Sequence, residues 1–378
     1  MTTLAPSPPV EAEPARRTSS PDAASRRTAA KQVGALVAVC LLVILAAPSD
    51  YTVRIATLVL VYAALAMGLN VVVGLAGLLD LGFIAFFGVG AYTYALLASD
   101  LHDIHLNFWV LLPVGMLVAA MLGVLVGLPA LRTHGDYLAI VTLGFGEIVF
   151  ILLVNLDRPV NITNGPQGVL GIDLPSIGGW ELGGEGVFLG AFGLTPTMQF
   201  FVLATLYVAA VMYCALRLRD ARLGRAWRAM RESEAATSSC GVSIVRAKMS
   251  AFVFGASVAG GAGVLTAAWY GSVFPDSFLF SESIKVLAMV VLGGIGSVWG
   301  ALAGALVLVL MPELLREFDQ YRLLIFGLVL VLVMRLRPQG LFGSRGPGVR
   351  GPGIRATGTL GDRIRRRLRR PTDRGGRS

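Results

Sequence analysis

Uninterrupted apolar runs of roughly 20 residues recur along this chain, and they limit its fold more than any other feature. Tyr137–Leu156 is one such run, and Glu147 is its single charged residue. A helix rises about 1.5 Å per residue, so a run of this length spans the hydrocarbon core of a bilayer, which is about 30 Å thick. Only 15% of the 378 residues are charged and the mean hydropathy is +0.72, whereas soluble domains carry about 25% charged residues. The sequence therefore predicts an all-α fold, a polytopic bundle of transmembrane helices.

The stretch Ile284–Met311 is longer than one span requires and contains Gly293, Gly294 and Gly296. Because a straight helix accommodates glycine poorly, we predict two short segments that meet at a glycine-rich turn buried in protein, where irregular backbone is tolerated. The chain then crosses the membrane ten times, within an expected 8–10 spans that include broken or re-entrant helices. The other predicted spans are Val33–Ala47, Ile55–Val73, Leu78–Ala98, Phe108–Pro129, Tyr137–Leu156, Gln199–Leu216, Met249–Tyr270 and Tyr321–Met334.

Basic residues are concentrated in the two tails and in one central loop, Arg217–Lys248. This is the distribution of the positive-inside rule, so the net charge of +9 does not indicate nucleic-acid binding. Ten crossings place both tails and the loop on the cytoplasmic side of the membrane. Residues 1–31 and 344–378 are predicted to be disordered, and 32–343 form the transmembrane domain. The Arg-rich C-terminal tail is expected to bind anionic lipid headgroups.

A cleaved signal peptide is the alternative interpretation of Val33–Ala47. The long tail that precedes this run argues against cleavage. We therefore take it as the first span.

The loop Arg217–Lys248 is the most highly charged segment between apolar runs. Gly241 is expected to end a helix in it, as a C-terminal glycine does. Such a short amphipathic helix suits contact with a soluble partner, and an ordinary basic loop that only sets topology is the alternative. In the helical interpretation Arg225, Trp227, Arg228, Arg231 and Glu234 lie on the surface, while Ala226, Ala229, Met230 and Ala235 form a small apolar stripe.

The segment Asp157–Thr197 is rich in Gly and Pro, and Arg158 is its one basic residue. By the count of crossings it faces away from the cytoplasm. Long loops without secondary structure are uncommon unless they are functional. A docking surface for an extracytoplasmic partner is therefore one interpretation, and a loose connector is the other.

Glycines at four-residue spacing, such as Gly296, Gly300 and Gly304, let helix backbones approach closely and predict a tightly packed bundle. Charged groups inside spans cost about 2.5–3.5 kcal/mol on insertion scales, so each requires a partner or a wet path. Glu147 lies near the middle of its span, where it either lines a translocation path or ties two helices together. The polar groups at or near membrane depth are Asn70, Asp80, Asp136, Glu147, Asn155 and Lys285, of which Asp80, Asp136 and Lys285 are expected to anchor helix ends.

No catalytic constellation is present in the sequence. Its three histidines are His102, His105 and His134, and no P-loop, nucleophile elbow or metalloprotease motif occurs. The three cysteines are isolated from one another and from histidine, so no metal site or disulfide framework is indicated. We predict that the chain is not an enzyme, holds no metal or cofactor, and depends on another chain for any ATP it uses.

Several stretches resemble the LivM/LivH permeases of ABC importers for branched-chain amino acids. The resemblance runs in order over about Val53–Gly343 and is closer to the LivM branch, in which the Gly-Asp-Tyr and Asn-Gly-Pro stretches occur. It rests on Gly68–Ser99 (GLNVVVGLAGLLDLGFIAFFGVGAYTYALLAS), Leu131–Phe150, Asn161–Ile172 (NITNGPQGVLGI), Leu223–Gly263, Lys285–Ala305 and Arg337–Gly343 (RPQGLFG).

The resemblance implies a permease subunit that works with a second homologous permease, two ABC ATPase subunits and an external solute-binding protein. It implies that the pattern Glu234-Ala235-Ala236, followed by Gly241, belongs to a coupling helix that fits a groove of the ATPase. The expected polar contacts are Arg225, Arg228, Arg231, Glu232 and Glu234, with Met230 and Ala235 entering the groove.

One departure from the family concerns Asp80 and Phe83, which stand where many members have Ser and then His or Gln. Asp80 and Phe83, together with Asn70 and Glu147, are the expected residues of the translocation path. If Asp80 and Phe83 touch the solute, the solute specificity differs from that of the other family members. An importer for urea or short amides would share nearly all of these motifs. An ion-coupled carrier would bury paired carboxylates, for which Glu147 is the one sign.

Overall fold

The computed structural model describes residues 21–46, 49–130, 136–157, 161–177, 180–182 and 195–315, together with residues 327, 328, 331, 335 and 340–342. Among these, five helices are long and apolar enough to span a membrane, and three shorter helices are also apolar. The prediction of an all-α polytopic bundle is confirmed. The long helices are Asp50–Leu75, Phe108–Pro129, Tyr137–Asn155, Pro196–Asp220 and Ile244–Tyr270, and the shorter ones are Thr28–Leu42, Ile84–Leu97 and Val298–Leu314.

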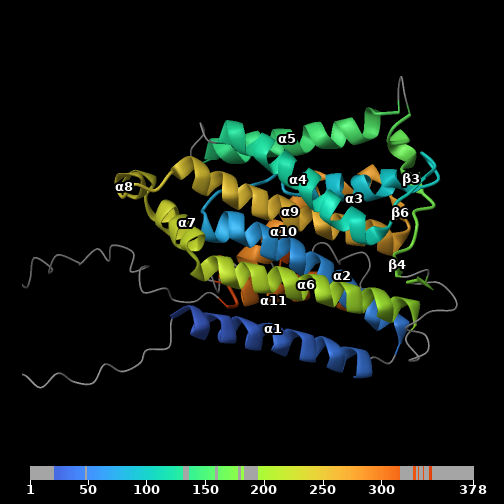
Figure 1. Ribbon diagram of the computed structural model, residues 1–378, viewed down its shortest axis with the longest axis horizontal. Helices are drawn as coiled ribbons and strands as arrows, with labels where there is room; N and C mark the ends of the chain where they lie inside the picture. The colour runs from blue at the N-terminus through green and yellow to red at the C-terminus, as the bar shows by residue number, and fades with distance from the viewer. Residues whose placement is uncertain are drawn as a thin grey trace, which may run out of the picture. The chain divides into compact units, whose positions relative to one another are not determined.

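The helices within residues 21–315 run between two ends (Figure 1). We call one the α7 end, because it holds α7 (Arg222–Glu232) and α8 (Glu234–Ser239). The other is the β end, where two-residue strands form antiparallel pairs. These pairs are β1 (Ala98–Ser99) with β2 (Ile104–His105), β3 (Val169–Leu170) with β6 (Ser272–Val273), and β4 (Ser176–Ile177) with β5 (Trp180–Glu181).

The helix α9 (Ile244–Tyr270) lies at the centre and packs most extensively against α3 (Ile84–Leu97) and α4 (Phe108–Ala130). Glycines make this close packing possible. A Cβ added to Gly90 on α3 would lie 2.1 Å from the carbonyl oxygen of Gly260 on α9, a distance that no real side chain tolerates. The expected role of the glycines in close helix packing is confirmed at this contact.

Two breaks between helices lie next to each other at the α7 end. The first separates α3 from α2 (Asp50–Leu69) and its π-helical extension η1 (Asn70–Leu75), and the second separates α10 (Phe280–Gly293) from α11 (Val298–Leu314), which pack against each other as a hairpin. The Gly296 amide of the second turn donates to Asn70 Oδ1 of the first at 2.7 Å. This hydrogen bond therefore joins the two breaks to each other.

The predicted division of Ile284–Met311 is confirmed, because α10 ends at Gly293 and α11 begins at Val298. Glu313 accepts a hydrogen bond from Tyr51, near the start of α2 at the β end. The Leu341 amide donates to the Leu292 carbonyl at 2.9 Å. Residues 313 and 341 thus lie at opposite ends of the bundle, as a count of ten crossings requires.

The first helix begins earlier than expected. α1 covers Pro21–Ala46, so the expectation of disorder is wrong for residues 21–31. This stretch is rich in Ala and Arg, which are strong helix formers, and it continues the apolar helix without a break. Residues 1–20, residues 344–378 and nearly all of the predicted span Tyr321–Met334 lie outside the described residues.

The remaining long helices are α5 (Asp136–Asn155) and α6 (Pro196–Asp220). α6 packs against α1 and α2, and α5 packs against α3 and α4 on the other side of the bundle. Each agrees with its predicted span to within a few residues.

The span predicted at Leu78–Ala98 is helical only from Ile84 onwards. Gly77 has φ of +74°, a conformation that glycine adopts without strain. Gly82 packs so tightly on α5 that a Cβ would lie 2.0 Å from the Thr142 carbonyl oxygen. Residues 78–83 therefore run as a non-helical segment against α5.

The described part of Asp157–Thr197 is folded onto the β end. The Asp173 amide donates to the Ala98 carbonyl at 2.8 Å, and β3 pairs with β6 after α9. The Asn-Gly-Pro stretch forms a turn in which the Asn164 amide donates to Asn161 Oδ1 at 2.8 Å. Residues 161–177 are thus a packed element, and the loose-connector interpretation is wrong for them.

Candidate functional site

The basic loop is built on a tryptophan anchor. Trp227 of α7 is fully buried, and its Nε1 donates to the Ala247 carbonyl and to Ser250 Oγ of α9, each at 3.0 Å. Met230, one turn later, is also buried. These two side chains fix α7 to α9 and leave Arg225 and Arg228 on the exposed face.

Two expectations for this segment are corrected. Trp227 was expected on the surface, and Met230 in the groove of a partner, but both pack inside this chain. Residues 227 and 230 are three apart, so they share one face of α7. That face meets α9, which the sequence of the loop alone does not reveal.

The segment also divides into two helices instead of one. Ser233 lies between them in an extended conformation, and its Oγ accepts from the Ala236 amide at 3.2 Å as the N-cap of α8. Gly241 follows α8 with φ of +80°, so it ends the helix as predicted. Ala235 and Ala236 of α8 are exposed, as is Glu232 at the end of α7.

Glu234 forms an ion pair that the sequence analysis missed. Its Oε1 lies 2.9 Å from Nζ of Lys248, whose side chain is 2% exposed. A buried ammonium group is tolerated only when it is paired. Glu234 therefore holds α8 against α9, in addition to any contact that it makes with a partner.

Arg231 connects α7 with the two breaks in the helices. Its Nη1 donates to the Gly74 carbonyl of η1. A Cβ on Gly77 would lie 2.7 Å from Arg231 Cγ, and one on Gly296 would lie 3.8 Å from its Nη1. This side chain of the loop thus contacts the first break, which is joined to the second through the hydrogen bond between Gly296 and Asn70.

The expected path residues divide into two groups. Asn70, Asp80 and Phe83 are buried in this chain. Asn70 holds Gly296, and Asp80 Oδ1 accepts from the Gly82 amide at 3.0 Å. Phe83 packs edge-on against Phe86, with ring centroids 6.1 Å apart. These three side chains shape the breaks in the helices.

Glu147 lies elsewhere, on the half-exposed side of α5. It makes no hydrogen bond or ion pair with another residue that the structure describes. Only 28% of the apolar part of α5 is buried, compared with 78% for α9. Glu147 was expected either to line a translocation path or to tie two helices together. Its described contacts include no tie to another helix of this chain.

The other polar groups anchor local structure. Asn155 Nδ2 donates to the Ile151 carbonyl in the last turn of α5 at 2.8 Å. Asp136 is the first residue of α5, and its side chain lies outside the described residues. Lys285 is in the second turn of α10, where its Nζ lies 2.5 Å from Glu282 Oε1.

Tyr62 and Glu282 form a polar contact inside the bundle that the sequence analysis did not identify. The Tyr62 hydroxyl donates to Glu282 Oε2 at 2.9 Å. The two residues are 220 positions apart, so no spacing rule brings them together. The available signal was Glu282 itself, an acidic residue three positions before Lys285 at the start of an apolar run.

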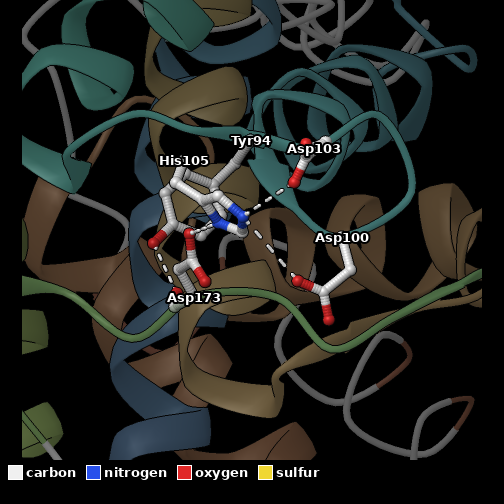
Figure 2. Close-up of polar contacts among 5 residues, drawn as sticks. All are labelled: Tyr94, Asp100, Asp103, His105 and Asp173. Atoms are coloured by element: carbon white, nitrogen blue, oxygen red, sulfur yellow. Dashed lines mark hydrogen bonds and ion pairs between the residues drawn. The ribbon is translucent and has the colours of Figure 1, made fainter.

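A histidine at the β end is surrounded by carboxylates (Figure 2). His105 Nδ1 lies 2.7 Å from Asp173 Oδ2, and its Nε2 lies 3.8 Å from both Asp100 and Asp103. The hydrogen bond to Asp173, the charge of Asp173, and then those of Asp100 and Asp103 raise the pKa of His105 above its usual value. Nearby, the Tyr94 hydroxyl donates to the Asp173 carbonyl at 2.7 Å. In the described part of the chain, no cluster of His, Cys, Asp and Glu has the arrangement of a metal site.

A family model described as "Branched-chain amino acid transport system / permease component" matches residues 51–334. The chain is 46% identical over 318 residues to a high-affinity branched-chain amino acid transport system permease protein, LivM, of Escherichia coli, and the match covers 81% of this chain and 73% of that relative. It is 28% identical over 294 residues to LivH of Salmonella typhimurium, with 75% and 91% covered. A probable LivM of Methanocaldococcus jannaschii is 27% identical over 308 residues, with 73% and 84% covered. No solved structure matches the chain.

Proposed function

This chain belongs to the family of permease components of branched-chain amino acid transport systems, and on that premise we propose that it moves branched-chain amino acids inward across a bacterial cytoplasmic membrane, driven by separate ATPase subunits. The observation that carries the ATP-driven mechanism is the hydrogen bond of Arg231 to the Gly74 carbonyl beside the first break, which Asn70 joins to the second. A soluble motor can move such a permease only through a rigid element at the membrane surface that is joined to the spans. The α7–α8 segment is such an element.

The exposed and buried faces of this segment suit two tasks. Arg225, Arg228, Ala235 and Ala236 are exposed and available to the ATPase. Trp227 is buried against α9, and Arg231, which is itself exposed, donates to the Gly74 carbonyl. When the ATPases close, a displacement of α7 is transmitted through Arg231 to the first break, and from there through Asn70 to the turn between α10 and α11. The helices on either side of these breaks then rock between outward-open and inward-open forms.

The proposed orientation puts the α7 end in the cytoplasm. Arginines are frequent there, including Arg217, Arg219 and Arg222 around the start of α7, as the positive-inside rule requires. The β end then faces outward. There the packed segment 161–177 and the carboxylates around His105 form a surface suited to an external solute-binding protein.

A second, homologous permease subunit completes the path in this proposal. The relatives include both LivM and LivH proteins. Glu147 is a carboxylate in the middle of an apolar helix, and such a group costs about 2.5–3.5 kcal/mol against lipid. A partner subunit beside α5 would give Glu147 a polar or wet environment.

The coupling role is tested with three arginine variants of the complete importer in proteoliposomes. Arg231→Gln should leave assembly with the ATPase intact but reduce leucine uptake about tenfold, because a hydrogen bond from a charged group contributes about 1.5–3 kcal/mol. Arg228→Glu should instead weaken retention of the ATPase on the purified permease. Arg246→Gln, an exposed arginine at the start of α9, is the control and should change neither.

Wild-type uptake by Arg231→Gln would reject the transmission step. Unchanged ATPase retention by Arg228→Glu would reject the docking face. Glu234→Lys is not a clean test of coupling. It would leave the buried Lys248 without its partner at a cost of about 3–5 kcal/mol, so a loss of uptake could come from misfolding.

A further inference from the structure

A cavity of about 260 Å³ lies between α2, α3, α9 and the segment that leads into α10. Its walls include Tyr62 on α2 and Glu282 on α10. Tyr62 is 12 residues beyond Asp50, the first residue of α2, so it lies about 18 Å along that helix. The cavity therefore extends from the β end, where Ser272 and Val273 of β6 line it, into the bundle.

One side of the cavity is polar. The Glu282 side chain is 17% exposed, its Oε2 accepts from the Tyr62 hydroxyl at 2.9 Å, and its Oε1 pairs with Lys285 at 2.5 Å. The hydroxyl of Ser277 also lines the space. A carboxylate inside such a bundle is expensive unless it is paired or serves a ligand. An acidic oxygen with neighbouring hydroxyl donors can bind an ammonium group next to a carboxylate.

Much of the remaining lining is apolar. It includes Leu58, Val61 and Ala91 together with two aromatic rings, Phe87 and Phe278. The two rings meet edge to face with centroids 5.5 Å apart, which holds this wall in place. A short aliphatic side chain fits such a surface.

We propose that this cavity is a solute-binding site within the single permease chain, and that it holds a small aliphatic amino acid in its zwitterionic form. The ammonium group replaces the Tyr62 hydroxyl on Glu282 Oε2, and Tyr62 turns its single hydroxyl hydrogen to the solute carboxylate, which also accepts from Ser277. The aliphatic side chain packs on Leu58 and its apolar neighbours. The volume agrees, because drug-sized ligands occupy about 300–1,000 Å³ and this space is smaller. The inference rests on the proposed transport function, and it places solute selectivity partly in this chain.

The site is tested by direct binding of tritiated leucine to the permease complex in nanodiscs, without the external binding protein. Glu282→Gln should weaken leucine binding at least tenfold, and Tyr62→Phe should weaken it less. The control pair is Glu313→Gln and Tyr51→Phe, because Tyr51 donates to Glu313 in the same way but outside the cavity. The controls should bind leucine as the wild type does.

A second variant separates ligand contact from a merely structural effect. Leu58→Ala enlarges the apolar side of the cavity, so phenylalanine should become a several-fold better competitor of leucine binding. Equal loss of binding in Glu282→Gln and Glu313→Gln, or an unchanged order of competitors in Leu58→Ala, would overturn the site. A wild-type importer that takes up no branched-chain amino acid would instead overturn the proposed function, so the two failures are distinguishable.

Discussion

His105 is held by three carboxylates at the β end, and its charge decides how firmly two segments are joined there. It lies on β2, in the connection between α3 and α4, while Asp173 belongs to the segment after α5. Asp100 and Asp103, in the β1–β2 turn, are the other charged groups that face it. Because these carboxylates favour the protonated form, the pKa of His105 in the folded chain is raised.

The sign of the pH dependence follows from that shift. The unfolded value is about 6.5, so the contact of His105 with Asp173 contributes its full stabilisation below that pH and loses it as the pH rises through the raised pKa. We predict that the hydrogen-exchange protection of the Asp173 amide, corrected for intrinsic exchange, falls over this range. The measurement is exchange mass spectrometry or NMR from about pH 5 to pH 9.

The matched controls are two histidine variants. His105→Gln should make the protection of this amide independent of pH, and His102→Gln should leave the wild-type dependence in place. The same slope in His105→Gln would assign the effect to another group. If the pH effect is confined to this contact, the stability of the β end depends on the pH outside the cell.

At the scale of elements, the α10–α11 hairpin depends on the absence of side chains. A Cβ on Gly304 of α11 would lie 1.9 Å from the Met289 carbonyl oxygen of α10. Gly144 of α5, in contrast, has no atom within 4 Å of the position that its Cβ would take. The two glycines occupy helices but differ in what surrounds them.

We predict opposite effects for alanine at these two positions. Gly304→Ala should lower the free energy of unfolding by about 1–3 kcal/mol, because the helices must separate to admit the methyl group. Gly144→Ala should leave it unchanged or raise it by about 0.4–1 kcal/mol, because alanine restricts the unfolded chain. Denaturant unfolding of the purified chain in detergent measures both, and equal destabilisation would show that the hairpin is loosely packed.

At the scale of the whole molecule, the long helices differ in how much of their apolar surface is covered. α2 and α9 are largely buried, whereas the apolar parts of α4 and α5 are only 33% and 28% buried. Most of that exposed surface suits lipid. Glu147 does not, and it singles out α5 as the helix beside which the second permease subunit is proposed to lie.

Cysteine cross-linking tests this arrangement in a chain that lacks Cys40, Cys214 and Cys240. Ile148→Cys, next to Glu147 on an exposed face of α5, should cross-link to a cysteine on the second permease subunit. Leu42→Cys on α1 is equally exposed to the membrane and should not. Cross-linking through α1 alone would place the partner on the opposite side and leave Glu147 to another role.

The sequence by itself determined the membrane class, the positions of most spans and the division at Gly293–Ser297. The length of a hydrophobic run decides whether a segment can span the bilayer, and the charge of the flanking loops decides its orientation. Both properties can be seen locally in the sequence. The end of α8 at Gly241 was predicted for the same reason, because one residue with positive φ ends a helix wherever it occurs. The resemblance to a permease family was also visible in contiguous motifs.

Only the tertiary structure decided which polar groups act together. From the sequence, Trp227 looks like a surface residue in a basic loop, but in the structure it packs against α9. Arg231 donates a hydrogen bond to the carbonyl of Gly74, which lies 157 residues earlier in the chain. Tyr62 and Glu282 meet across 220 residues to form one wall of a cavity. Period and propensity report on neighbours along one helix, whereas these contacts depend on how separate helices pack, so they become visible only in the folded chain.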